Sequence, residues 1–275
     1  MLAAWYKLIM KLSIVILHHG SPKDVTANLQ ALRWADLPVG PDGKPDVEVL
    51  VVNNGRRGAN AEIPMDANPD FDLRYFEIPN DGYPAGNNFG FAETSGDFLC
   101  ILNPDIEVEK DTFQVLMDYM EARPQVGIVA PRLVYPDGVV QDNFRTFPRW
   151  LDLIIKRTFL RRIFRGRMRR YLMWDKDPAL SEKVDWLTGA LQLFTRKSWE
   201  ALGPNDERYF LFMSDVDICK TAWKRGWEVH FVGETQCLHN DERLSAGGVM
   251  EVFKNKLVRI HIWDAVKFYF KWKGR

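Results

Sequence analysis

The sequence predicts an α/β fold in which helices flank a mixed, mostly parallel central sheet. Short apolar runs, typical of buried strands, alternate along the first half of the chain with segments of helical periodicity. Strands separated by helices favour a parallel sheet with right-handed crossover connections. The chain has 275 residues, of which 46% are hydrophobic, so it is long enough to bury the core of one large domain.

The individual elements follow from these patterns. Apolar and β-branched runs predict strands at 13–17, 47–52, 73–78, 98–102, 126–130 and 229–232. Apolar residues spaced three and four apart predict helices at 24–34, 84–95, 112–122 and 218–225. Loops are expected at 39–45, which is rich in Pro, Gly and Asp, and at 233–238.

The composition excludes several classes of protein. Thirty-seven basic and 37 acidic residues cancel, which argues against global polyanion binding, and no segment matches a nucleic-acid-binding module. Cys100, Cys219 and Cys237 lack the spacing of a metal or redox site, so we expect a reduced, cytoplasmic protein. No uncharged run approaches the roughly 20 residues that a helix needs to span a bilayer.

The strand at 98–102 ends abruptly in Asn103, Pro104 and Asp105. Proline has no N–H and cannot continue a central strand, so Asp105 is expected at the carboxyl edge of the sheet. Ligands bind at that edge in open α/β sheets. A carboxylate there suits a hard divalent cation that is also held by a substrate's phosphates. The alternative is an ordinary turn, because Asn-Pro-Asp is common turn chemistry.

Three other predicted strands also end in polar residues. These ends are His18-His19-Gly20, Asn53-Asn54-Gly55 and Asn80-Asp81-Gly82, the last of which runs into a Gly- and Asn-rich helix start at 83–90. Glycines at such a helix start allow backbone N–H groups to approach a phosphate. Four polar strand ends at one sheet edge predict a binding pocket.

These motifs, taken in order, resemble the family 2 glycosyltransferases, particularly the rhamnosyltransferase-like branch. The resemblance covers about residues 13 to 239, and it is specific as a set although each motif alone is weak. The matching motifs are Val52-Asn53-Asn54, Gly82-Tyr83-Pro84-Ala85-Gly86-Asn87-Asn88, Asn103-Pro104-Asp105, Asp185-Trp186-Leu187-Thr188-Gly189-Ala190, Phe210-Leu211-Phe212-Met213-Ser214-Asp215-Val216-Asp217 and His239.

The resemblance implies a GT-A fold and a division of the chain. Residues 1–240 would form the glycosyltransferase domain, with a nucleotide-binding half at about 12–105 and an acceptor half at about 106–240. A basic helical insertion at 150–174 would interrupt the acceptor half, and 241–275 would form a C-terminal basic amphipathic helix.

The resemblance also implies the reaction and the role of each residue. An inverting enzyme would use a divalent cation, Mg²⁺ or Mn²⁺, to transfer a sugar from a nucleotide diphosphate sugar to a glycan or polyprenyl-linked glycan. L-Rhamnose from dTDP-rhamnose is the favoured donor. The implied catalytic base is Asp215, and the implied metal ligands are Asp105 and His239. The implied nucleotide-sugar contacts are His18, Asn53, Asn54, Asp81, Gly82, Asn88 and Asn103. The implied acceptor contacts are Trp186, Gly189 and Asp217.

Each of these roles has a structural alternative. Asp215 and Asp217 precede a predicted helix, where carboxylates are favoured as caps or in the first turn. The alternative for His239 is a structural histidine, and the alternative for Trp186 is a side chain that fills the core. A sugar nucleotidyltransferase is disfavoured, because 20–23 is a poor match to the basic Gly-rich loop that such an enzyme needs.

Two residues depart from the family pattern. Asn53 replaces an aspartate at the base-contacting position, which removes a charge and leaves the nucleotide preference open, including a UDP-linked donor. Ser214 replaces the glutamate that precedes the base. These departures motivate an alternative in which the chain is a non-catalytic scaffold with the same fold.

Two segments of the chain are both basic and apolar. Between Leu153 and Trp174 there is no acidic residue, and apolar residues recur at helical spacing, which predicts an amphipathic helix broken near Gly166. The C-terminal segment at 253–273 repeats this pattern. Such helices lie on anionic membrane surfaces, so we expect peripheral attachment to the inner face of the cell membrane. The alternative is a packed helix with a solvated cationic face.

Overall fold

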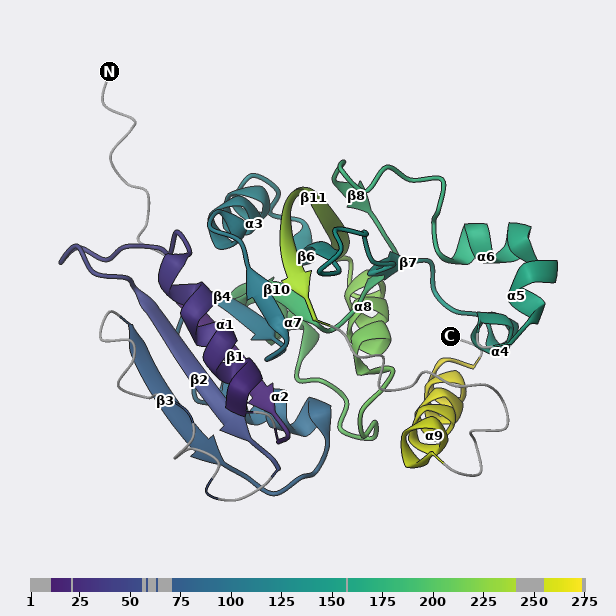
Figure 1. Ribbon diagram of the computed structural model, residues 1–275, viewed down its shortest axis with the longest axis horizontal. Helices are drawn as coiled ribbons and strands as arrows, with labels where there is room; N and C mark the ends of the chain where they lie inside the picture. Colours follow the sequence, from purple (N-terminus) through teal and green to yellow (C-terminus); the bar gives the residue numbers. More distant parts are fainter. Residues whose placement is uncertain are drawn as a thin grey trace.

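The computed structural model describes residues 11–20, 22–55, 58, 63, 71–156, 158–240 and 255–273 (Figure 1). In these residues a nine-stranded sheet lies between two layers of helices, and six of the nine strands run in the same direction. In spatial order the strands are β3 (Asp72–Glu77), β2 (Val47–Asn53), β1 (Leu12–His18), β4 (Phe98–Leu102), β10 (Leu191–Thr195), β6 (Val126–Val134), β11 (Glu228–His239) and β5 (Ile106–Val108), with β8 (Glu182–Lys183) paired to β11. A separate pair joins β7 (Phe144–Arg145) to β9 (Trp186–Leu187).

Each face of the sheet has its own apolar core, because side chains of a strand alternate between the two faces. Helices α1 (Pro22–Trp34) and α3 (Thr112–Glu121) pack against one face, with Ile14 and Ile16 of β1 beneath them. The other face carries α2 (Tyr83–Ala92), α7 (Arg196–Leu202), α8 (Ser214–Lys224) and α9 (Lys256–Trp272), with Val15 and Leu17 of β1 beneath them. The predicted α/β class is confirmed.

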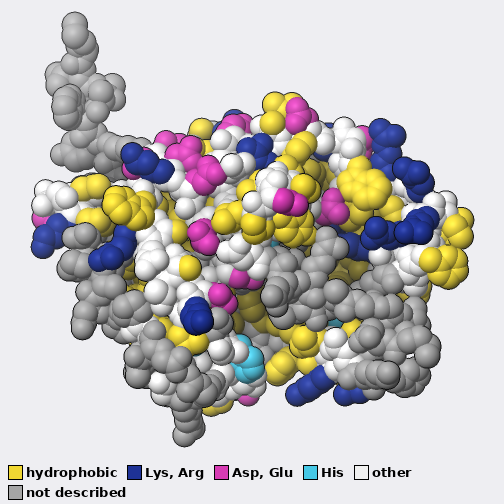
Figure 2. Space-filling view, in the orientation of Figure 1, with side chains coloured by type: hydrophobic (Ala, Val, Ile, Leu, Met, Phe, Trp, Pro, Cys, Tyr) yellow, Lys and Arg dark blue, Asp and Glu magenta, His cyan; other side chains and the backbone are white. Residues whose placement is uncertain are grey.

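The short helices α4 (Trp150–Lys156), α5 (Leu160–Ile163) and α6 (Arg165–Tyr171) lie together at one end of the molecule, near α9 (Figure 1). Figure 2 shows Lys and Arg side chains interspersed with hydrophobic ones at that end. The predicted break near Gly166 falls at Phe164, between the end of α5 at Ile163 and the start of α6 at Arg165, while α4 forms a separate helix that ends at Lys156. Ile155, Met168, Tyr171 and Leu172 form a small core of their own.

Two further boundaries differ from the predictions. Helix α8 begins at Ser214, four residues before the predicted start, so Asp215 and Asp217 lie inside its first turn. The predicted loop at 233–238 is part of β11, which continues to His239. Its polar sequence pairs with β6 on one side and β5 on the other, and these backbone hydrogen bonds outweigh its weak local strand pattern.

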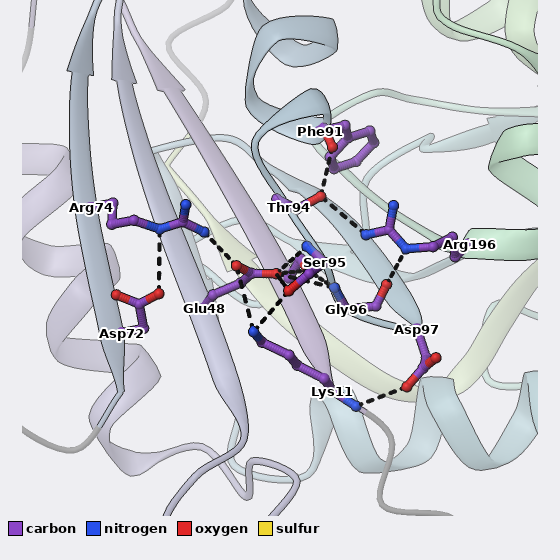
Figure 3. A network of polar contacts seen from close by, with 11 residues as sticks. Lys11, Glu48, Asp72, Arg74, Phe91, Thr94, Ser95, Gly96, Asp97 and Arg196 are labelled. Carbon is purple, nitrogen blue, oxygen red and sulfur yellow. Dashed lines mark hydrogen bonds and ion pairs between the residues drawn. The ribbon is translucent and has the colours of Figure 1, made fainter.

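A buried carboxylate ties strands together at the amino ends of β1 and β2, the edge opposite the predicted pocket (Figure 3). Glu48 is 2% exposed and accepts hydrogen bonds from Ser13 Oγ at 2.7 Å and from the Ser95 N–H at 2.6 Å. Burial acts to raise the pKa of Glu48, but these bonds, with Lys11 and the paired Arg74, hold it below its ordinary value. The network is structural, because it links strands far from the polar strand ends.

Candidate active site

The carboxyl ends of β1 and β2 place His18 and Asn53 side by side as register partners. His18 is 1% exposed, and neither ring nitrogen has a hydrogen-bond partner in the described residues. Burial, assisted by the neighbouring His19, lowers the pKa of His18, so the ring is neutral at pH 7. The Asn53 side-chain oxygen accepts a hydrogen bond from the Gly55 N–H at 2.8 Å and shapes the turn after β2.

Amide side chains connect the ends of β1, β2 and β3. Asn54 Nδ2 donates to Asn80 Oδ1 at 3.3 Å, and Asn54 Oδ1 lies 3.2 Å from His19 Nδ1. Asn80 Oδ1 also accepts from the Gly82 N–H at 3.2 Å. Asp81 is exposed and lines a cavity of about 540 Å³ beside α2. The predicted nucleotide contacts at these strand ends therefore lie close together.

The start of α2 is held tightly against the loop that precedes α8. Gly82 has a φ of 106°, and a Cβ there would lie 2.5 Å from the Phe210 carbonyl oxygen, so only glycine fits. The Tyr83 N–H donates to this same oxygen at 2.7 Å. Gly86 and Gly90 face β1, where a Cβ would collide with Leu17 and Val15 side chains. These two glycines therefore serve close packing of α2 on the sheet.

Asn88 holds the same loop from the next turn of α2. Its Nδ2 donates to the Asn205 carbonyl at 2.9 Å and to Glu207 Oε1 at 2.8 Å, and its Oδ1 accepts from the Asn205 N–H at 2.9 Å. Because both ends of the amide are engaged, Asn88 positions the loop that leads toward α8.

The structure brings Asp105 and His239 together, although they are far apart in the sequence. Pairing of β5 with β11 sets the His239 Nε2 atom 3.4 Å from Asp105 Oδ2. Gln141 Oε1 lies 2.7 Å from His239 Nδ1 and fixes the orientation of the ring. The other carboxylate oxygen, Asp105 Oδ1, is buried and has no hydrogen-bond partner in the described residues. A carboxylate and an oriented imidazole fit a divalent cation.

Asp215 lies in the first turn of α8, directly after a turn at Met213. Met213 has a φ of 69°, a left-handed conformation that a non-glycine residue rarely adopts. Asp215 Oδ2 accepts from the Gly189 N–H at 3.3 Å, and Oδ1 accepts from the Val216 N–H at 2.8 Å. Burial raises the pKa of the Asp215 carboxyl, while these two bonds and the charge of Arg145 act in the opposite direction.

Tyr83 connects the two carboxylates. Its hydroxyl lies 2.7 Å from the Gly189 carbonyl, beside Asp215, and 2.9 Å from Asn103 Oδ1, two residues before Asp105. Burial raises the pKa of Tyr83 far above its ordinary value, and the charges of both Asp215 and Asp105 raise it further. The candidate base and the candidate metal ligand therefore face one region.

Comparison with known proteins identifies this arrangement. Residues 13–178 match glycosyl transferase family 2, which is more than half of the chain. The chain belongs to this family. Its nine-stranded sheet, and the carboxylates at the strand ends, are thus the framework of a family 2 glycosyltransferase, and the predicted rhamnosyltransferase-like resemblance is confirmed by the relatives below.

Two relatives show which branch of family 2 is similar. An N-acetylglucosaminyl-diphospho-decaprenol L-rhamnosyltransferase of Mycobacterium tuberculosis is 26% identical over 226 residues, which are 70% of this chain and 66% of the relative. The rhamnosyltransferase WbbL of Escherichia coli is 23% identical over 145 residues, covering 52% of each chain. The family 2 chain thus spans between half and two-thirds of the length of these two relatives.

A solved structure establishes the fold of this family 2 chain. A mannosyltransferase from Pyrobaculum calidifontis, in complex with GDP-Man and Mn²⁺, matches with a TM-score of 0.62 at 16% identity. The match covers 95% of this chain and 65% of the other. The fold is GT-A, as the resemblance implied.

Of the three residues that were predicted to contact an acceptor, Trp186 and Asp217 are buried and Gly189 is partly exposed. Trp186 is 5% exposed, and its Nε1 donates to the Thr146 carbonyl at 2.9 Å. Asp217 is 3% exposed, and it accepts from Lys271 Nζ at 2.5 Å and Trp272 Nε1 at 2.7 Å. Asp217 therefore joins α8 to α9, whereas Gly189 contacts the candidate base itself.

The sequence did not single out Asp264 of α9, which holds the loop at 210–212 before α8. This carboxylate is 1% exposed and accepts hydrogen bonds from the backbone N–H groups of Phe210, Leu211 and Phe212, at 3.1 Å each. Lys267 Nζ lies 3.1 Å from its other oxygen. A buried anion thus holds the loop at 210–212, which packs against Gly82 and leads to Asp215. Tyr83, Gln141 and Arg145 were also missed as site residues, although Tyr83 lies within the quoted motif at 82–88 and four of the five residues at 141–145 are polar.

Proposed function

We propose that this chain is an inverting glycosyltransferase of cell-surface polysaccharide synthesis. It transfers a sugar, L-rhamnose for preference, from a nucleotide diphosphate sugar such as dTDP-rhamnose to a lipid-linked glycan. The observation that carries the proposal is that the Tyr83 hydroxyl donates to the Gly189 carbonyl beside Asp215 and lies 2.9 Å from Asn103 Oδ1, two residues before Asp105, so that the charges of both carboxylates act on it. The names of the two rhamnosyltransferase relatives support the sugar, and the name of the Mycobacterium tuberculosis relative supports the lipid-linked acceptor.

Asp215 serves as the base in this proposal. Inversion by a single displacement needs one group to accept the proton of the attacking hydroxyl on the side opposite the leaving group. Burial raises the pKa of Asp215, which makes its carboxylate a stronger proton acceptor than an exposed one. The Gly189 N–H holds one carboxylate oxygen in place, and the Tyr83 hydroxyl fixes Gly189 in turn.

Asp105 and His239 would hold a divalent cation, Mg²⁺ or Mn²⁺. When bound, the cation supplies positive charge to a diphosphate leaving group. The partnerless Asp105 Oδ1 and the ring orientation set by Gln141 support this assignment, as does Mn²⁺ in the Pyrobaculum structure. The part of the chain that the structure describes contains no cluster of three His, Cys, Asp or Glu side chains, so phosphates and water would complete the coordination.

Transfer assays with a panel of nucleotide sugars test the proposed function. The purified protein, a prenyl-diphosphate-linked N-acetylglucosamine and Mg²⁺ are incubated with dTDP-rhamnose or with UDP-linked sugars, and products are followed by mass spectrometry. We expect rhamnose transfer, with the new linkage showing inverted anomeric configuration by NMR. Donor binding without transfer to any acceptor would support the non-catalytic alternative instead. Transfer from a UDP-linked sugar alone would support glycosyltransferase activity but contradict dTDP-rhamnose as the donor.

The end of the molecule formed by α4–α6 and α9 is the proposed membrane-facing surface. The rings of Trp150 and Tyr269 lie 5.1 Å apart, so α4 and α9 form one surface. In the described residues, no helix is both long and apolar enough to cross a bilayer. We call the surface formed by α4–α6 and α9 the basic face, after the arginines of α5 and α6. Large apolar side chains are also exposed on it. Its exposed apolar residues are Trp150, Leu151, Ile154, Phe159, Ile163, Phe164, Ile262, Trp263 and Phe270.

Arginines of α5 and α6 complete the basic face (Figure 2). Arg161, Arg162, Arg169 and Arg170 are all exposed, and each basic residue near an anionic surface contributes about 1 kcal/mol to binding. Lys267 and Lys271 of α9, by contrast, point inward to Asp264 and Asp217. The cationic character of the basic face therefore comes chiefly from α5 and α6.

Changing these four arginines to Gln tests the membrane assignment. We expect co-sedimentation with vesicles containing 30% phosphatidylglycerol to weaken by about 10²–10³-fold, because about 4 kcal/mol of attraction is removed. The matched control changes four exposed cations elsewhere, Lys23, Arg33, Lys44 and Lys197, to Gln. Equal loss in both variants would mean that net charge, and not the basic face, controls binding.

A further inference from the structure

Arg145 is a half-buried cation without an anionic partner. It lies in β7 directly opposite Trp186 of β9, and its guanidinium carbon is 4.8 Å from the centre of the Trp186 ring. Its Nη2 donates to the Asp142 carbonyl at 2.5 Å. Its Nε is buried without a partner, and no carboxylate forms an ion pair with it in the described ranges of the chain.

Arg145 lies near the candidate base, because its strand partner Trp186 is three residues before Gly189. Trp186 begins the segment that continues to Gly189, whose N–H donates to Asp215. The charge of Arg145 acts on Asp215, where it opposes the larger effect of burial on the carboxyl pKa. Removing a cation from water is costly unless an anion compensates it. The planar guanidinium, which lies over an indole ring, matches the oxygens of a phosphate group.

The proposed reaction contains two diphosphates, one in the donor and one in a lipid-linked acceptor. Asp105 and His239 lie at the end of the site assigned to the donor diphosphate. Arg145 lies next to the basic face, because the Thr146 N–H donates to the Tyr171 carbonyl of α6 at 3.1 Å and α4 begins at Trp150. An acceptor that enters from a membrane at the basic face would pass Arg145 before reaching Asp215.

We propose that Arg145 binds phosphate oxygens of the acceptor's diphosphate and thereby selects acceptors whose sugar is joined to a lipid through a diphosphate. The proposal rests on the proposed function, since it names a contact for that reaction's acceptor. It assigns the acceptor diphosphate to the Trp186 side of the site and the donor diphosphate to the Asp105 side.

The test compares two acceptors that differ only in the diphosphate. One is N-acetylglucosamine joined through a diphosphate to a ten-carbon prenyl chain, and the other is the same sugar joined directly to that same chain as a geranyl glycoside. The measured quantity is the ratio of kcat/KM for the first acceptor to kcat/KM for the second. This ratio cancels any effect of a substitution on Asp215, because both acceptors use the same base.

We expect Arg145→Gln to lower this ratio by about 10–100-fold, the effect of losing a charge-assisted hydrogen bond, and Arg145→Lys to lower it less. Arg123→Gln is the matched control, because Arg123 also stacks on an aromatic ring, 3.9 Å from the centre of Tyr119, but at the amino edge of the sheet. This variant should keep the wild-type ratio. Calorimetry with geranyl diphosphate, in the absence of divalent cations, should show the tightest binding for the wild type and Arg123→Gln, weaker binding for Arg145→Lys and the weakest for Arg145→Gln.

The outcomes distinguish failure of the role proposed for Arg145 from failure of the proposed transferase function. An unchanged ratio in Arg145→Gln, with geranyl diphosphate still binding as in the wild type, would overturn the assignment. A rise in the KM of the donor alone would show that Arg145 binds the donor diphosphate, which also overturns it. If the wild-type protein transfers sugar to neither acceptor, the proposed function fails, while the calorimetric comparison still decides whether Arg145 binds a prenyl diphosphate.

Discussion

Replacing Asp215 with Asn is expected to lower kcat for sugar transfer by about 10²–10⁴-fold, the contribution of a positioned general base. An amide has nearly the shape of the carboxylate but cannot accept the proton of the attacking hydroxyl. The KM for the donor should change little, because Asp215 contacts Gly189 and Val216 and not the Asp105 end of the site. Initial rates with the preferred donor and acceptor measure both quantities.

The stability of Asp215→Asn should not fall at neutral pH, which separates loss of chemistry from loss of fold. Since burial raises the pKa of Asp215 in the folded protein, its ionised form opposes folding at pH values above that pKa, and the neutral amide removes this cost. Asp217→Asn is the contrasting variant. It removes an ion-pair partner of Lys271 and should lower stability by about 1–3 kcal/mol. Wild-type turnover by Asp215→Asn would contradict the assignment.

The same pKa shift sets the pH dependence of the reaction. Transfer requires ionised Asp215, so kcat should fall as the pH drops through the raised pKa of this group. The acid limb of the profile is therefore expected above the ordinary carboxyl value of about 3.9. Asp215→Asn should remove this limb from its residual activity, and an acid limb that persists in the variant would belong to another group.

Asp105→Asn is expected to remove the metal dependence of donor binding. The substitution turns the carboxylate, whose buried Oδ1 has no hydrogen-bond partner in the described residues, into a neutral amide. We therefore expect kcat/KM to fall by at least about 100-fold. Calorimetry with the nucleotide sugar should show that Mg²⁺ or Mn²⁺ strengthens binding to the wild type but no longer to the variant. Treatment of the wild type with a chelator should reproduce this loss.

Asp137→Asn is the matched control for Asp105→Asn. Asp137 is an exposed turn carboxylate whose Oδ1 accepts from the Val139 N–H at 3.0 Å, and its replacement should leave metal-dependent donor binding intact. Full turnover by Asp105→Asn, or donor binding that remains sensitive to the cation, would move the metal site elsewhere.

The sequence alone predicted the α/β class, most of the strands and the polar strand ends. These features are local: a buried strand needs a continuous apolar run, as in 98–102, and Pro104 ends such a run wherever it occurs. The motif order then indicated the family, and with it Asp105, Asp215 and His239. Local pattern failed at β11, where backbone pairing with β6 and β5 extends a strand through a polar sequence.

The tertiary structure decided which of these residues lie close together, and which other side chains position them. Tyr83 bonds to Gly189, which lies 106 residues later in the chain and beside Asp215. Asp264 accepts a hydrogen bond from Phe210, which lies 54 residues earlier in the loop before α8. No periodicity encodes such contacts, because they depend on how helices and strands pack and not on the spacing of residues along one element. Arg145 likewise reads as one basic residue among many in the sequence. Only the pairing of β7 with β9 places it over Trp186 and near the candidate base, and no carboxylate in the described residues forms an ion pair with it.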